Sequence, residues 1–266
     1  MTDLNALAAR AVAGDGEALS SLCQQLETPV FQLCLRMLGD TRDAEDAAQD
    51  VLIKVITHLG NFQGRSALMT WVHQVTVRHV FAMQKGRAES RAVDEETFAE
   101  LLEQGLAFGA TQPPPSPEDR ALLTEVRLSC TQGMLLMLSR EERVALVLVE
   151  LLGWDAAQAA EVAEISHDAM RQRVARARNR LTTFLQAKCG QANPGAACHC
   201  EKQLPAKQAM GLTAQTQRFA PLSRGDLVHA NAELKAIRAA FQREGAWGAP
   251  ATLRARLQKL LPTVLT

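Results

Sequence analysis

The chain has 266 residues, enough for about two domains of ordinary size, and its 47% hydrophobic content is sufficient for packed cores. Its 29 Lys and Arg balance 29 Asp and Glu, so any nucleic-acid surface has to come from local segregation of charge. With no Tyr, 8 Phe and 3 Trp, an extended aromatic platform for single-stranded nucleic acid is excluded.

The sequence gives no sign of a membrane span or an export signal. Its longest apolar stretch, residues 144–152, is interrupted by Glu150 and falls short of the ~20 residues that a span requires. The N-terminus lacks the basic region of a signal peptide, so we expect a cytoplasmic protein. Six cysteines are too few for a disulfide scaffold in a chain of this length. We interpret three of them as small core residues on helices: Cys23, Cys34 and Cys130.

Apolar residues recur at spacings of three and four along nearly the whole chain, which predicts an all-α protein. We expect two small helical domains, residues 1–88 and 117–187. A flexible acidic and Pro-rich linker, 89–116, joins them, and a helical C-terminal extension, 188–266, follows. The linker ends in three prolines and has room for a brief helix around 94–106.

In the first domain, glycines and capping residues mark the helices. The first two predicted helices end at glycines, and Pro29 kinks or divides the second. Asp40 caps a third helix, 44–59. A loop at 60–66 then precedes a fourth helix, which contains Trp71.

The third predicted helix carries an acidic row. Its apolar residues cover one broad face, whereas Asp43, Asp46 and Asp50 share another. Such a row is either a solvated face or a surface that docks on a partner of complementary charge.

In the second domain, two capping boxes fix helix starts. The patterns Ser139-x-x-Glu142 and Asp155-x-x-Gln158 each satisfy backbone amides that lack a partner within the helix. A short turn with Ser166 as the next cap separates the last two helices, which is typical of a helix-turn-helix. The predicted helices of this domain cover residues 117–137, 140–152, 156–163 and 167–187.

Helix 167–187 separates its charged from its apolar residues, with five arginines within ten residues. Arginine reads guanine, glutamine and asparagine read adenine, and further arginines neutralise phosphates, so this face suits a major groove. A solvated basic face is the alternative interpretation. The polar face is formed by Arg171, Gln172, Arg173, Arg176, Arg178, Asn179 and Arg180, opposite a stripe of Met170, Val174, Ala177, Leu181 and Leu185.

Over about residues 4–187, the chain resembles the extracytoplasmic-function sigma factors of bacteria, which are promoter-recognition subunits of RNA polymerase. Each motif alone is weak, but all of them in this order are highly specific. The first domain carries Ala13-Gly14-Asp15, Leu35-x-x-Leu38-Gly39-Asp40, Asp43-Ala44-Glu45-Asp46-Ala47-x-Gln49-Asp50-Val51 and Phe62-x-Gly64-x-Ser66-x-x-x-Thr70-Trp71. The second domain carries Leu138-x-x-Glu141-Glu142-Arg143 and Ile165-Ser166, followed by Arg171-x-Arg173-Val174-x-Arg176-Ala177-Arg178-x-Arg180-Leu181.

This resemblance implies a transcription initiation factor with no catalytic step and no required cofactor. Its partners would be core RNA polymerase and promoter DNA, with an anti-sigma factor as a further candidate. The clamp helices of the largest polymerase subunit would face Asp46, Gln49 and Asp50. A base flipped out of the minus-10 element would lie in a loop that contains Phe62, Gly64, Arg65 and Ser66. In the minus-35 element, base edges would lie near Arg171, Gln172, Ala175 and Arg176, and the DNA backbone near Arg173, Arg178 and Arg180.

The chain departs from the family pattern at faces expected to meet DNA. Arg78 stands where asparagine is common, and Glu164 occupies a turn position where glycine is common. Asp168 replaces another glycine, and Gln74 and Ala82 leave the fourth helix less basic than usual. These departures bear on how far this chain melts the minus-10 element.

The C-terminal extension contains a cluster of cysteines, Cys189, Cys198 and Cys200. Their spacing fits three thiolates around zinc or another metal, and a fold that brought His167 or His229 nearby would complete the shell. A labile disulfide is equally compatible with these residues, and an inert, reduced surface segment is the leading alternative interpretation.

Two amphipathic helices, 226–245 and 250–261, are predicted beyond the cysteines. We expect them to form a hairpin that packs on the second domain. Our hypothesis is that the extension regulates the factor.

An alternative function is a stand-alone helix-turn-helix transcriptional regulator with a metal- or redox-sensing tail, whose first domain serves only dimerisation. Binding of residues 1–90 to core polymerase is expected only for a sigma factor. A zinc enzyme is disfavoured, because the chain lacks a His-Glu-x-x-His helix and a glycine loop for nucleotides.

Overall fold

The computed structural model describes the residues 3–83, 93–212, 249–253 and 255–257. Over these residues the regular structure is helical, apart from one isolated bridge between the backbones of Cys189 and Cys198. The expected all-α class is therefore confirmed. None of the described helices is both long and apolar enough to cross a bilayer.

The first domain consists of α1 (Leu4–Val12), α2 (Gly16–Leu38), α3 (Thr41–Thr57), the 3-10 turn η1 (Leu59–Asn61) and α4 (Leu68–Ala82). Helix α2 continues through Pro29, so the chain is not divided there. Asp40 caps α3 as predicted, because its carboxylate accepts hydrogen bonds from the amides of Arg42 and Asp43.

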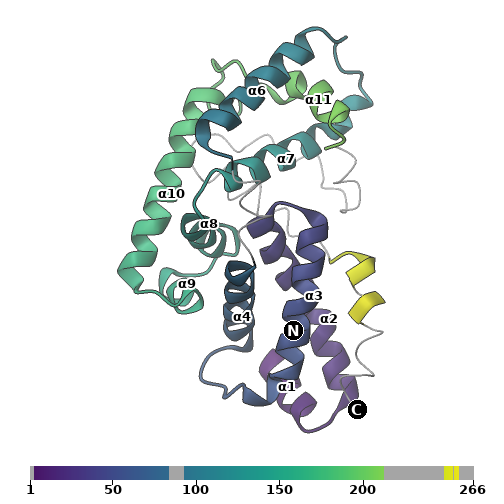
Figure 1. Ribbon diagram of the computed structural model, residues 1–266, viewed down its shortest axis with the longest axis vertical. Coiled ribbons are helices and arrows are strands. Elements are labelled where there is room, and N and C mark those ends of the chain that lie inside the picture. Colours follow the sequence, from purple (N-terminus) through teal and green to yellow (C-terminus); the bar gives the residue numbers. More distant parts are fainter. Residues whose placement is uncertain (1–2, 84–92, 213–248, 254, 258–266) are drawn as a thin grey trace.

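Helix α6 (Glu95–Ala110) occupies most of the described part of the predicted linker, and it is longer than the brief helix expected there. It packs against α11 (Cys200–Ala209), at the top of Figure 1. Two glycines permit this approach, since a Cβ on Gly105 would collide with the Gln203 side chain and one on Gly109 with the Lys202 carbonyl oxygen. This part of the linker is therefore a packed element that binds the start of the C-terminal extension.

The second domain consists of the 3-10 turn η2 (Asp119–Leu122), α7 (Leu123–Leu136), α8 (Arg140–Leu146), the π-helical segment η3 (Val147–Leu151), α9 (Ala156–Ala163) and α10 (His167–Lys188). Both predicted capping boxes are present, before α8 and before α9. Two predicted helices differ from the structure. A 3-10 turn takes the place of the first turns expected from residue 117, and the helix expected over 140–152 becomes π-helical at Val147.

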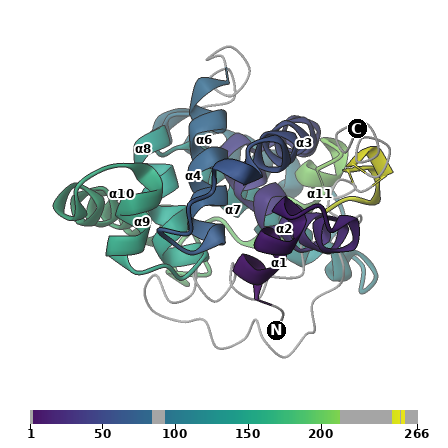
Figure 2. The same ribbon diagram turned by 90° about the horizontal axis from the view of Figure 1, so that it is seen from below.

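The two domains pack directly against each other, and one hydrophobic cluster runs through both. Helix α4 lies against α9, while α2 contacts α7 and α8; Figure 2 shows α4 between α9 and the α2–α3 pair. Side chains of the second domain also bond the backbone of the first. Gln132 Nε2 donates to the Arg36 carbonyl oxygen at 3.3 Å, and Arg140 Nη1 to that of Phe81 at 3.4 Å.

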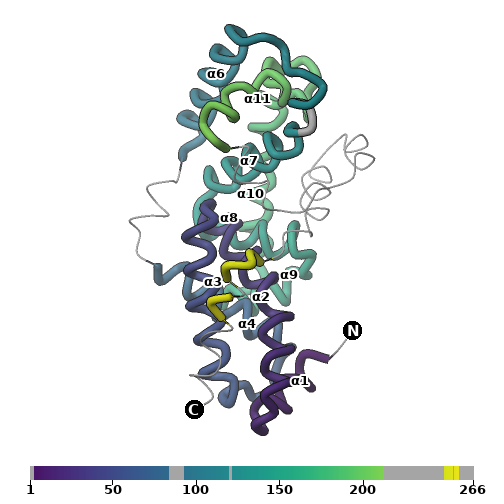
Figure 3. The backbone as a smooth tube through the Cα atoms, turned by 90° about the vertical axis from the view of Figure 1, so that its right-hand side faces the viewer, coloured from purple at the N-terminus to yellow at the C-terminus, as the bar shows by residue number. Residues whose placement is uncertain are grey.

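The described part of the second tail helix, within 249–257, lies on the first domain beside α2 and α3 (Figure 3). The expectation that it packs on the second domain is therefore wrong. Leu253 and Leu257 lie one helical turn apart, are 0% and 2% exposed, and join the hydrophobic cluster. The amide of Ala249 donates to Thr28 Oγ1 at 3.2 Å. The other predicted tail helix, 226–245, lies outside the described residues.

His73 lies at the contact between the domains and makes the fold sensitive to acid. Its ring packs on Trp154 with centroids 4.9 Å apart, and neither ring nitrogen has a hydrogen-bond partner in the described structure. Burial lowers the pKa of His73 from 6.5 to about 4. Because the neutral form is favoured in the folded state, the stabilisation is complete above pH 6.5 and is lost as the pH falls towards 4.

We therefore expect the free energy of unfolding to fall by an extra ~3 kcal/mol between pH 6.5 and 4, relative to His73→Leu. Urea denaturation at each pH measures this difference. A His167→Leu variant, which changes an exposed histidine, should keep the wild-type slope. An equal pH slope in the wild type and in His73→Leu would contradict the assignment.

Candidate functional site

The outer face of α3 presents an acidic ridge, Asp46, Gln49 and Asp50, on a firmly packed helix. Its opposite face is fully apolar and packs on α2. The side chains of Asp46 and Asp50 are each 63% exposed, whereas Asp43, the first residue of the predicted row, is buried in the first turn. The structure therefore brings together the three residues expected to meet polymerase and separates Asp43 from them.

The two ends of the acidic ridge have different neighbours. At one end, Arg256 Nη1 lies 2.9 Å from Asp46 Oδ1 and 3.4 Å from Gln49 Oε1. At the other end, Asp50 lies 3.7 Å from His79 Nε2. Sequence reasoning missed Arg256, because no local pattern relates the end of the chain to α3.

The loop between η1 and α4 is anchored at one side and open at the other. Phe62 packs on Trp71 with ring centroids 5.6 Å apart, and the Leu68 amide donates to Asn5 Oδ1 at 2.9 Å. Gly64 has a φ of 67°, which favours glycine, and it is exposed together with Arg65. The structure therefore brings Phe62, Gly64, Arg65 and Ser66 together in one loop, with the Phe62 ring packed and the Gly64 backbone exposed.

Helix α10 has the predicted amphipathic geometry. Ser166 caps it by accepting a hydrogen bond from the Ala169 amide at 3.2 Å. The residues expected near base edges, Arg171, Gln172, Ala175 and Arg176, are all exposed. The apolar stripe opposite is buried at Met170, Val174, Ala177 and Leu181.

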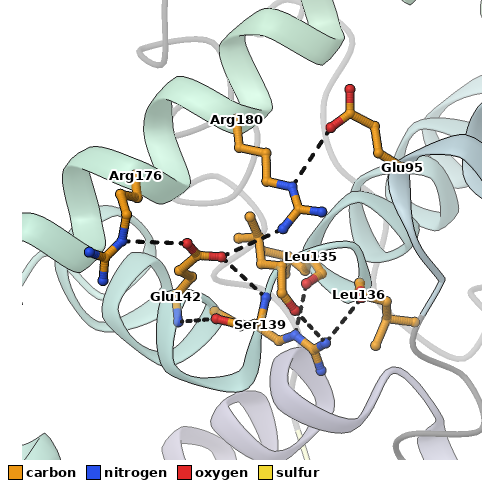
Figure 4. A network of polar contacts seen from close by, with 9 residues as sticks. Glu95, Leu135, Leu136, Ser139, Glu142, Arg176 and Arg180 are labelled. Carbon is orange, nitrogen blue, oxygen red and sulfur yellow. Dashed lines mark hydrogen bonds and ion pairs between the residues drawn. The ribbon is translucent and has the colours of Figure 1, made fainter.

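Three arginines of α10 form ion pairs within the chain, and Figure 4 shows those of Arg176 and Arg180. Arg178 Nε donates to Glu150 Oε1 at 2.8 Å, and Glu150 is only 6% exposed. Arg176 and Arg180 each lie 3.7 Å from carboxylate oxygens of Glu142. Glu150, which interrupts the longest apolar stretch of the sequence, thus has a partner in α10. Phosphate contacts by Arg178 would compete with this carboxylate.

The turn between α9 and α10 carries a backbone outlier. Glu164 has a φ of 55°, a left-handed conformation that costs a non-glycine residue free energy. Its Oε2 accepts from Arg78 Nε at 2.9 Å, and this pairing raises the pKa of Arg78 and lowers that of Glu164. Beside it, Gln74 Nε2 donates to the Glu161 carbonyl oxygen at 3.0 Å. The polar face of α4 therefore contacts the helix-turn-helix, through two residues that depart from the family pattern.

The extension cysteines lie beside α7 in the structure. Burial raises the pKa of Cys198 and of Cys200, and it raises that of Cys130, on α7, to about 12. Cys130 is only partly buried and packs against the hydrophobic cluster, whereas Cys23 and Cys34 are buried in it as predicted. The charges of the extension thiols add to the pKa shift of Cys130. A raised pKa disfavours the thiolate that binds metal. Within the described residues, no three His, Cys, Asp or Glu side chains are placed to hold an ion.

Two family models match the chain, in the order of its domains. The sigma-70 region 2 model matches residues 22–85, and the sigma-70 region 4 model matches residues 128–181. The first match includes the acidic ridge and the loop before α4. The second includes the helix-turn-helix as far as Leu181.

Several RNA polymerase sigma factors are similar to this chain over about two thirds of its length. The RNA polymerase sigma-H factor of Pseudomonas aeruginosa is 30% identical over 184 residues, 68% of this chain and 92% of the relative. The ECF RNA polymerase sigma factor SigM of Mycobacterium tuberculosis is 26% identical over 185 residues, 69% of this chain and 85% of the relative. SigW of Bacillus subtilis is 23% identical over 177 residues, 65% of this chain and 91% of the relative.

Proposed function

Since this chain belongs to the extracytoplasmic-function class of the sigma-70 family, we propose an assignment of its surfaces to the partners of a sigma factor. The protein is an RNA polymerase sigma factor that directs the enzyme to promoters for transcription initiation. It supplies no catalytic step of its own in this proposal, and it acts in the cytoplasm, where the polymerase makes RNA.

The acidic ridge is the proposed contact for the clamp helices of the largest polymerase subunit. Its two carboxylates are exposed on a helix whose other face is rigidly packed, so a docking partner meets a preformed charged surface. The single observation that carries the proposal is this exposed ridge within the region 2 match, on the same chain as an exposed basic helix within the region 4 match.

DNA contacts are proposed for two further surfaces. The loop with Phe62, Gly64, Arg65 and Ser66 is assigned to a flipped minus-10 base, and α10 to the minus-35 element. At α10, base edges are assigned to Arg171, Gln172, Ala175 and Arg176. The DNA backbone is assigned to Arg173, Arg178 and Arg180, two of which first have to leave carboxylate partners in the chain.

Replacing Arg176 with alanine should weaken promoter binding by the holoenzyme by ~1–3 kcal/mol, with the loss concentrated at one base position of the minus-35 element. Fluorescence anisotropy on a set of single-base promoter variants measures this. An Arg10→Ala variant, remote from α10, should bind like the wild type. Equal loss on every sequence would show a phosphate contact instead.

Selection of DNA from a random pool separates the proposed function from a stand-alone regulator. A sigma factor should enrich paired minus-35 and minus-10 elements only when core polymerase is present. Enrichment of the same sites by the protein alone, with no effect of polymerase, would favour the helix-turn-helix regulator with a sensing tail.

The extension thiols stay a predicted site for zinc or another metal, and the raised thiol pKa values give it no support in this arrangement. An anti-sigma factor likewise remains a proposed partner. The metal site is tested by comparing the metal content of the purified protein with that of a Cys198→Ser, Cys200→Ser variant. The anti-sigma factor is tested by whether a partner protein co-purifies with this chain from the native host.

A further inference from the structure

The C-terminal segment 249–257, described at residues 249–253 and 255–257, packs two kinds of side chain against the first domain. Leu253 and Leu257 are buried in the hydrophobic cluster, and Thr252 and Arg256, on the adjacent stripe of the same helical turns, face α3. The segment is therefore amphipathic in a way that matches the surface beneath it.

The polar stripe lies on residues of α3 at and beside the acidic ridge. Thr252 Oγ1 donates to Glu45 Oε2 at 2.8 Å, and Arg256 contacts both Asp46 and Gln49. These α3 residues follow each other at spacings of one and three positions, so one short helical segment contacts two of the three ridge residues. Asp50 has no contact with the segment among the interactions that the structure describes.

The buried leucines, more than the ion pair, hold the segment in place. The side chains of Arg256 and Asp46 are 50% and 63% exposed, and an ion pair between such exposed groups contributes little. Apolar burial in contrast removes both leucines from water. Because the contact depends mainly on two leucines, we expect a larger partner surface to displace the segment.

We propose that the C-terminal segment and core RNA polymerase compete for the same face of α3, so that the segment acts as an internal occupant of the docking surface. The inference rests on the proposed role of the acidic ridge. Arg256 presents to Asp46 and Gln49 the cationic chemistry that a basic polymerase surface would present. Docking then requires release of Leu253 and Leu257 from the first domain.

Competition is tested by the affinity of the full-length protein for core polymerase. If the ridge is free in only a tenth of the molecules, the apparent affinity is tenfold below the intrinsic one. We therefore expect Leu253→Ala with Leu257→Ala to bind core polymerase about tenfold more tightly than the wild type. Arg256→Ala should give a smaller gain in the same direction, with less risk to folding. Leu101→Ala, at an exposed leucine on α6, and Arg10→Ala are the matched controls.

Hydrogen exchange of the wild-type protein gives a second measurement. Peptides covering 249–257 should exchange faster when core polymerase is added, while peptides covering 43–50 become more protected. Unchanged exchange of 249–257 in the complex, or unchanged affinity in both tail variants, would overturn the competition.

A third variant, Asp50→Lys, distinguishes failure of the competition from failure of the docking assignment. It changes a ridge residue that the segment does not contact. Weaker polymerase binding by Asp50→Lys, with no effect of the tail variants, would contradict only the competition. Unaltered binding by Asp50→Lys in both the wild-type and the tail-variant backgrounds would contradict the docking assignment, and the competition with it.

Discussion

Replacing Arg143 with methionine should lower the free energy of unfolding by ~2–4 kcal/mol. The guanidinium is 2% exposed and donates to four backbone carbonyl oxygens at 2.5–3.2 Å. These carbonyls lie at or just beyond the C-terminal ends of α2 and α7, where the last groups of a helix lack partners within it. Methionine fills a similar volume but removes these donors, so of the four carbonyls only Leu135 keeps a described partner, the Leu138 amide at 3.2 Å. The four acceptors belong to Met37, Leu135, Leu136 and Leu138.

Urea denaturation followed by circular dichroism measures this loss. Arg143→Lys is the informative companion variant, because a single ammonium group cannot make all the hydrogen bonds of the guanidinium. Its stability should lie between that of the wild type and that of Arg143→Met. Arg10→Met, at an exposed arginine, should change stability little. A loss below 1 kcal/mol in Arg143→Met would show that Arg143 does not join the ends of α2 and α7.

Reversing both charges of the acidic ridge, Asp46→Lys with Asp50→Lys, should weaken binding to core polymerase by ~2–4 kcal/mol, about 30- to 1000-fold. The loss should shrink at high salt, because both carboxylates are exposed and their interactions are screened. The fold should be unaffected, since neither side chain contributes to the apolar face that packs on α2. Titration of labelled protein with core polymerase at two salt concentrations measures the effect.

Glu17→Lys with Glu100→Lys is the matched control for these charge reversals. It makes the same change in net charge at two exposed carboxylates, one on α2 and one on α6. This control should bind core polymerase within about twofold of the wild type. Equal weakening in both double variants would mean that net charge, not the ridge, determines the affinity.

Features determined by neighbouring residues could be predicted from the sequence. The capping boxes before α8 and α9, the Asp40 cap and the amphipathic α10 depend on residues within a few positions of each other, and all are present. The acidic ridge was predictable for the same reason. Helical periodicity placed Asp43 in the same row as Asp46 and Asp50. It could not show that Asp43 is buried, because this burial depends on tertiary packing.

Features that depend on distant residues could not be predicted. The seat of segment 249–257 on α3 joins residues about 200 positions apart, and its amphipathic pattern alone does not say which domain offers a complementary surface. Arg143 lies within a recognised motif, but the sequence did not indicate that its side chain joins the ends of α2 and α7. The one available signal was a charged residue at the start of an apolar run. Arg78 and Glu164 each stood out in the sequence as a departure from the family pattern. Only the packing of α4 on α9 shows that they pair.

The most direct test of the account is run-off transcription with purified core polymerase on a template pool with randomised minus-35 and minus-10 elements. The full-length protein should start transcripts at a defined distance from a common pair of elements, and core polymerase alone should not. The Asp46→Lys, Asp50→Lys protein should lose this initiation, and the Glu17→Lys, Glu100→Lys protein should retain it. The account would be contradicted if neither the wild type nor the Leu253→Ala, Leu257→Ala protein gave specific transcripts. Full initiation by the Asp46→Lys, Asp50→Lys protein would also contradict it.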